Sequence, residues 1–69
     1  MIFVTVGTEL PFDRLVIAVD RWAAESGRND LFAQIGDGGW QPRFPFKHFL
    51  DPAEFAAKFE SAKLVVAHA

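Results

Sequence analysis

The amino-terminal part of the chain shows two hydrophobic patterns. Residues 2–6 are apolar or β-branched without alternation, which is typical of a parallel strand buried on both faces, and Gly7 ends this run. After Pro11, which suits the first position of a helix, apolar side chains recur at helical spacing. These are Phe12, Leu15, Val16, Val19, Trp22 and Ala23, and the charged Asp13, Arg14, Asp20, Arg21 and Glu25 fall largely between them. The pattern predicts a strand and then an amphipathic helix that stops near Gly27, with Trp22 on its buried side.

The middle of the chain reads as a strand, a loop and a second strand. Residues 31–35 form a short apolar run, and the Gly-Asp-Gly-Gly sequence that follows breaks it. Residues 36–45, with three Gly, two Pro and Trp40, predict a loop. Residues 46–49 are then a strand candidate.

The last third predicts a helix and a final strand. Asp51 suits an N-cap, Pro52 the first helical position and Glu54 the third. The apolar stripe of this helix consists of Phe55, Ala56, Phe59 and Ala62. Residues 64–67 then form an apolar run that predicts a buried strand.

This order of elements predicts a single α/β domain over residues 1–69, with a Rossmann-like parallel sheet of about four strands and two helices. If the strands are ordered 3-2-1-4, the two crossovers place one helix on each face of the sheet. One helix does not cover a four-stranded face. The pattern therefore indicates either that sequence is missing or that the chain self-associates.

Composition narrows the class of protein. Of the 69 residues, 51% are hydrophobic, with eight Phe and two Trp, which is ample for a core and leaves apolar surface for a partner. The net charge is −2 and no Lys/Arg run occurs, so a nucleic-acid binder is not expected. The chain has no Cys, no apolar run of membrane-spanning length and no signal-peptide pattern, so a cytoplasmic protein is expected.

Four segments, in chain order, carry a resemblance to a known family. They are MIFVTVGT at 1–8 with PFDRL at 11–15, FAQIG at 32–36, FLDPAEF at 49–55 and AKLVVAHA at 62–69. Together they resemble the first half of the C-terminal domain of family 28 glycosyltransferases. The similarity is closest to the small catalytic subunits of two-component transferases. These include the eukaryotic subunit that adds the second N-acetylglucosamine to the dolichol-linked precursor, and bacterial exopolysaccharide counterparts.

The resemblance implies a function and a partner. Members of this family transfer a sugar from a UDP-sugar, their substrate, to a lipid-linked acceptor, and the resemblance implies no cofactor. A membrane-attached partner subunit supplies the other half of the cleft, which would place a cytoplasmic chain at the membrane surface. In the family, the strand that ends in His-Ala leads into a glycine-rich turn and a helix facing the donor diphosphate. This sequence stops after His68 and Ala69, so we expect a truncated donor-binding domain that is inactive alone.

Gly7, Thr8 and His68 are the candidate donor contacts that follow. Gly7 and Thr8 offer backbone N–H groups and a hydroxyl where a phosphate settles at a strand-to-helix turn, although an ordinary turn also needs a glycine. His68, at the end of a strand, could donate a hydrogen bond to a phosphate or a sugar hydroxyl, or could simply be a frayed terminal residue.

Gln34 and Gly36 lie at the carboxyl end of the second strand, where ligands bind in open α/β sheets, and could border the donor site. The alternative is a polar strand residue and a turn glycine. Trp40, Phe44 and Phe46 could stack on a base or sugar, or pin their loop to the core.

Catalytic and metal-binding residues are not evident. Glu9 and Asp13 have no visible carboxylate partner for acid–base chemistry, and dipole-stabilised, solvated carboxylates explain both. His48 and His68 lack the spacing of metal ligands. The sequence thus predicts the donor-binding part of a UDP-sugar-dependent transferase. A non-enzymatic module that self-associates or docks onto a partner is the alternative.

Overall fold

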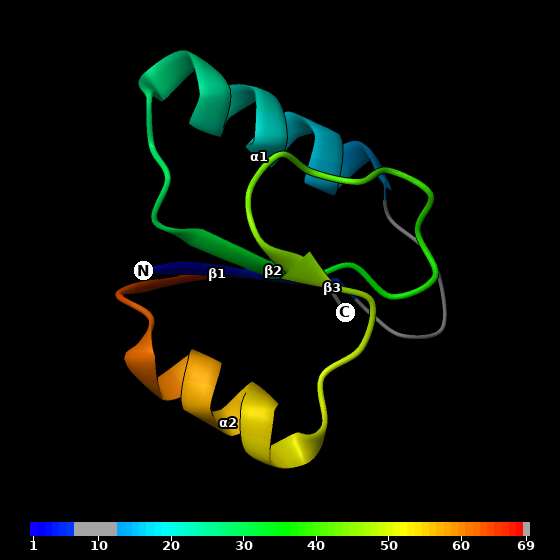
Figure 1. Ribbon diagram of the computed structural model, residues 1–69, viewed down its shortest axis with the longest axis vertical. Coiled ribbons are helices and arrows are strands. Elements are labelled where there is room, and N and C mark those ends of the chain that lie inside the picture. The colour runs from blue at the N-terminus through cyan, green and yellow to red at the C-terminus, as the bar shows by residue number, and fades with distance from the viewer. Residues whose placement is uncertain (7–12, 69) are drawn as a thin grey trace.

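The computed structural model of the chain describes residues 1–6 and 13–68. Strands and helices follow one another in the predicted order (Figure 1). The elements are β1 (Ile2–Val6), α1 (Asp13–Ser26), β2 (Leu31–Gln34), β3 (Phe46–Lys47), α2 (Pro52–Ser61) and β4 (Leu64–His68). The predicted start of the first helix at Pro11 lies outside the described residues, and the helix is seen from Asp13 onward.

The four strands form one parallel sheet in the order β3-β2-β1-β4. For this order the crossovers are expected to place one helix on each face, and α1 and α2 do lie on opposite faces of the sheet (Figure 1). The central strand β1 pairs on both sides, with Ile2 opposite Leu31 of β2 and Leu64 of β4. The chain therefore has a small Rossmann-like α/β fold, as its sequence predicts.

Strand β3 is shorter than predicted, because only Phe46 and Lys47 have strand geometry. Hydrogen bonding with the end of β2 nevertheless continues past it. The backbone N–H of Ile35 donates to the Lys47 carbonyl at 3.0 Å, and that of Gly36 to the His48 carbonyl at 2.8 Å. Residues 46–48 thus follow β2 to its carboxyl end, where the chain turns toward α2.

The main core lies between α1 and the sheet. Alternate residues of β1 and β2 point to this side and pack against α1 and the loop before β3. Its buried members are Ile2, Val4, Val6, Val16, Ala23, Leu31, Ala33, Ile35 and Phe44. The composition of β1, apolar on both faces, agrees with a central strand that α1 and α2 cover from either side.

Two predictions about α1 are wrong. Trp22 was expected in the core but is 44% exposed, with the Arg28 guanidinium 5.7 Å from the centre of its ring. Asp20, expected on the polar side, is only 1% exposed. At about 100° per residue, Asp20 lies about 40° from Val16 around the helix, whereas Trp22 lies about 120° away. The buried face is centred on Val16 and Ala23, so it includes Asp20 and leaves Trp22 at the surface.

The Asp20 carboxylate holds the loop of residues 36–45 against α1. It accepts hydrogen bonds from the Trp40 indole Nε1–H at 3.1 Å and from the Arg43 backbone N–H at 3.0 Å. The Arg43 Nε–H also donates to it, at 3.4 Å. A buried charge is costly unless it is paired and hydrogen-bonded, and these three donors meet that requirement.

The same contacts determine the charge state of Asp20. Burial by itself raises the pKa of this carboxyl, but the hydrogen bonds from Arg43 and Trp40, with the positive charge of Arg43, outweigh burial and lower the pKa below 3.8. A carboxyl with a lowered folded-state pKa stabilises the protein above its unfolded pKa. This contribution disappears as the pH falls through the lowered value.

A second carboxylate of α1, Asp13, supports the same loop. It accepts hydrogen bonds from the backbone N–H groups of Gly39 at 3.3 Å and Trp40 at 3.4 Å. Asp13 and Asp20 are seven residues apart, so both lie on the same side of α1. Asp13 is therefore an anchor for the loop, rather than the solvated carboxylate that the sequence suggested.

Helix α2 begins as predicted but is poorly covered. The Asp51 carboxylate accepts the Glu54 backbone N–H at 2.8 Å as the N-cap, and Pro52 occupies the first helical position. Phe55 packs edge-on against Phe3 of β1, with ring centres 5.3 Å apart. The rest of the predicted stripe is not buried: Phe59 is 53% exposed and no residue of α2 is fully buried. The second face of the sheet thus retains exposed apolar surface.

Replacing Asp20 by Asn should destabilise the protein in a pH-dependent manner. At neutral pH we expect the free energy of unfolding to fall by about 1.5–3 kcal/mol, because charge-assisted hydrogen bonds are weakened. The gap to the native protein should begin to narrow below about pH 3.8, where the carboxyl of the unfolded chain takes up a proton, and should close further as the pH falls through the lowered pKa of the folded protein. Urea unfolding at both pH values measures this, and Asp37→Asn, at an exposed carboxyl of the same loop, is the matched control. An equal gap at both pH values would contradict the proposed role of the charge.

Candidate functional site

The predicted site residues that the structure describes lie where the parallel strands end. We call this side of the sheet, formed by the carboxyl ends of the strands, the carboxyl edge. Thr5 of β1 is opposite Gln34 of β2, and Val6 is opposite His68 of β4. Gly36 follows β2 at the same edge. Strand β1 separates Gln34 from His68, so about 10 Å, or two strand spacings, lies between their backbones. The strand order reverses between β1 and β4, and such a switch point is where open α/β sheets bind ligands.

Gln34 is a buried connector between β1 and the start of α2. Its side chain is 6% exposed. The Nε2–H donates to the Thr5 hydroxyl at 3.2 Å, and the Oε1 accepts the Leu50 backbone N–H at 2.8 Å. Leu50 directly precedes the N-cap of α2. The Gln34 amide therefore holds the segment before α2 at the carboxyl edge. Both its nitrogen and its oxygen already have hydrogen-bond partners within the protein.

Gly36 makes the turn that leaves β2. Its φ of 61° lies in the left-handed region, where a side chain would be strained. Its carbonyl lies 2.9 Å from the Nδ1 of His48, in addition to its backbone hydrogen bond to the His48 carbonyl. These contacts agree with the turn glycine that the sequence offered as one reading. Contact of Gly36 or Gln34 with a donor stays a prediction.

The other predicted donor contacts flank the same switch point along the chain. Gly7 and Thr8 directly follow Val6 in the sequence but lie outside the described residues. His68 is placed by its backbone pairing with Val6 in β4. The β1–β4 register thus brings the last residue before Gly7 next to His68, which is the juxtaposition that a shared donor site requires.

The aromatic residues between β2 and α2 pin their segment to the core. Phe44 is buried, while Trp40 and Phe46 are half-buried and pack against the core cluster. The Trp40 indole N–H donates a hydrogen bond to the Asp20 carboxylate. Of the two roles that the sequence left open for these aromatics, the packing corresponds to the structural one.

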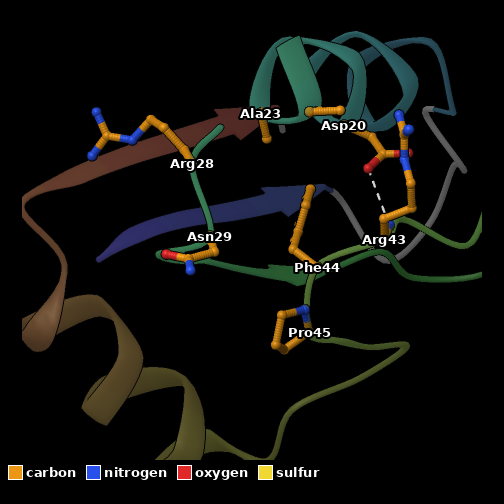
Figure 2. A pocket seen from close by; sticks show the side chains of 8 residues that line it. Asp20, Ala23, Arg28, Asn29, Arg43, Phe44 and Pro45 are labelled. Atoms are coloured by element: carbon orange, nitrogen blue, oxygen red, sulfur yellow. Dashed lines mark hydrogen bonds and ion pairs between the residues drawn. The ribbon is translucent and has the colours of Figure 1, made fainter. Parts of the chain in front are cut away.

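A cavity of about 160 Å³ lies away from the carboxyl edge, between the second half of α1 and the segments that lead into β2 and β3 (Figure 2). Ala23 and Ala24 of α1, with Phe44 and Pro45 before β3, provide its apolar walls. Gln34 and Gly36 do not line it. This cavity is therefore separate from the predicted donor site.

Sequence reasoning missed this cavity because three separate segments form it. One signal was present: Asp20 lies close to Val16 in helical projection, which marks a carboxylate on the buried side of α1. A buried carboxylate needs donors, and the loop of residues 36–45 provides them from Trp40 and Arg43. The position of those donors along the loop has no periodic signature.

Two further classes of site are tested by the described residues. Residues 1–6 and 13–68 contain no group of three or more His, Cys, Asp or Glu side chains that could hold a metal ion. In the same part of the chain, no helix has the length and apolar character needed to cross a bilayer.

Replacing Gln34 by Met should loosen the carboxyl edge. The thioether keeps the length of the side chain but removes both hydrogen bonds, which leaves the Leu50 N–H without its acceptor. We expect the free energy of unfolding to fall by about 1–3 kcal/mol in urea. Thr5→Val, which removes only the hydroxyl partner, should cost about 0.5–1 kcal/mol. A Gln34→Met protein as stable as the native one would show that this connector is not needed.

Comparison of the chain with protein-family models, with curated proteins and with solved structures finds no match. The fold is therefore assigned from the structure of this chain alone. It has four parallel strands in the order β3-β2-β1-β4 and one helix on each face of the sheet.

Proposed function

We propose that this chain is the donor-binding part of a UDP-sugar-dependent glycosyltransferase, with the donor at the carboxyl edge of β1, β2 and β4. One observation carries the proposal: the β1–β4 register brings His68 level with Val6, the residue before Gly7. In the segments that resemble family 28 glycosyltransferases, Gly7, Thr8 and His68 are the residues expected near the donor.

The chemistry of this edge suits a nucleoside diphosphate. The sequence predicts that Gly7 and Thr8 form a turn between a strand and a helix, where backbone N–H groups and a hydroxyl would meet phosphate oxygens and the positive end of the helix would favour the negative charge. The imidazole of His68 would add a donor from the neighbouring strand. A nucleoside diphosphate sugar spanning the ends of β1 and β4 is therefore the ligand class that these residues favour.

Gln34 and Gly36 have supporting roles in this proposal. Gln34 holds Thr5 and Leu50 together, and Gly36 turns the chain away from the end of β2. Both shape the border of the site. A base that activates the acceptor would come from other segments or from a membrane-attached partner subunit, and such a subunit would hold this chain at the cytoplasmic face of the membrane.

A second candidate function is supported by α2. No residue of this helix is fully buried, and Phe59 and Leu64 are 53% and 54% exposed. An isolated chain with so much exposed apolar surface tends to associate. A self-associating or partner-docking module without catalysis would use the face around Phe59, whereas a donor-binding protein would use the carboxyl edge.

Ligand-observed saturation-transfer NMR with UDP-N-acetylglucosamine tests the first proposal, with ADP as the control nucleotide. We expect signal for the uridine and sugar protons but not for ADP. Gly7→Val should abolish it, because the added side chain blocks close approach to the phosphates. The matched control is Gly27→Asn, at the other edge of the sheet. Gly27 has φ 68° and no atom within 4 Å of an added Cβ, and Asn tolerates this conformation.

The following outcomes distinguish donor binding from association. Silence with UDP-N-acetylglucosamine, from a chain that is folded by its amide spectrum, would contradict donor binding. A mass above the monomer by light scattering, reduced to the monomer by Phe59→Lys, would then favour the association module. Equal signal from ADP would mean that the edge binds phosphate without reading uridine, which also contradicts the proposal.

A further inference from the structure

The cavity beside α1 lies at the opposite edge of the sheet from the proposed donor site. Arg28 and Asn29 directly precede β2, and Phe44 and Pro45 directly precede β3, so the cavity is near the amino ends of these strands. In Figure 2, Ala23 on α1 faces Phe44 across the cavity, with Arg28 on one side and Arg43 on the other. A ligand here would not compete with one at the carboxyl edge.

The size and walls of the cavity suit one aromatic ring. Its volume is about 160 Å³, comparable to the roughly 150 Å³ of an apolar protein cavity that accommodates benzene. Ala23 and Ala24 contribute short side chains to one wall. Phe44 opposite them offers a ring for stacked or edge-on packing.

Both arginines beside the cavity are ion-paired, and they differ in which nitrogens remain for a ligand. The Arg28 guanidinium is occupied by Asp30, with Nε and Nη2 donating to its two carboxylate oxygens at 3.0 and 2.7 Å. The Asp20 carboxylate is occupied by Trp40 and Arg43. Arg43 uses its backbone N–H and its Nε–H for Asp20, and within the described residues its terminal nitrogens have no partner. Its side chain is 64% exposed, so these nitrogens are accessible.

We propose that this cavity binds a small aromatic carboxylate. The ring lies between the alanines of α1 and Phe44, and the carboxylate accepts hydrogen bonds from the terminal nitrogens of Arg43. Asn29, which also lines the cavity, provides a neutral amide at the rim. Because the Arg43 Nε–H donates to Asp20, the guanidinium is oriented before the ligand arrives.

Benzoate is the probe for this site, followed by amide chemical shifts of the native chain. A ligand of this size should bind with a dissociation constant of about 1 mM and shift the amides of Asn29, Arg43 and Phe44. Benzyl alcohol, which keeps the ring but lacks the charge, should bind about tenfold more weakly. Arg43→Gln should reduce benzoate affinity to that of benzyl alcohol.

A matched pair of alanine variants locates the site. Ala24→Leu fills the cavity and should abolish benzoate binding, whereas Ala18→Leu should leave it unchanged. Both alanines are exposed on α1, but Ala18 lies about 120° around the helix from Ala24 and outside the cavity. Saturating UDP-N-acetylglucosamine should not displace benzoate, which keeps this result independent of the donor site.

Three results would overturn the proposal. The first is the absence of amide shifts at benzoate concentrations about ten times the expected constant. The second is equal affinity for benzoate and benzyl alcohol, which would show that the site does not recognise the carboxylate. The third is unchanged binding in a folded Ala24→Leu protein. The comparison of the two probes needs only the native chain, so it decides the matter even if a variant fails to fold.

Discussion

The structure depends on one buried carboxylate. Asp20 lies within the apolar face of α1, and its charge is stable there because Trp40 and Arg43 donate three hydrogen bonds to it. Those bonds dock the loop of residues 36–45 on α1 and bring Phe44 into the core. Without this contact, the polar backbone of a ten-residue connection would have few partners within so small a molecule.

The docked loop connects the two edges of the sheet. It leaves the carboxyl end of β2 at Gly36 and returns to the amino end of β3 at Pro45. Asp13 holds its first half and Asp20 its second half, both from the same side of α1. The two proposed sites lie at opposite ends of this loop. Helix α1 therefore anchors the loop that joins the two edges.

Much of the fold could be predicted from sequence, because each main element has a local cause. The apolar run of β1 and the Asp51-Pro52 start of α2 indicate their structures independently of the rest of the chain. For the order 3-2-1-4, right-handed crossovers then place one helix on each face of the sheet. The extent of β3 and the surface position of Trp22 could not be predicted, because both depend on which neighbours tertiary packing supplies. Position at the carboxyl edge was predictable for Gln34 and Gly36. Their hydrogen bonds to Leu50 and His48 were not, since these join segments distant in the chain.

Hydrogen exchange of the two indole N–H groups tests the role of Asp20 most directly, because one spectrum contains both the bonded and the reference group. The Trp40 indole donates to Asp20 at 3.1 Å, whereas Trp22 lies on the same helix as Asp20 and is 44% exposed. If Asp20 holds the loop on α1, the Trp40 indole proton exchanges at least about tenfold more slowly than that of Trp22 at neutral pH. Equal exchange rates for the two indoles would contradict the account.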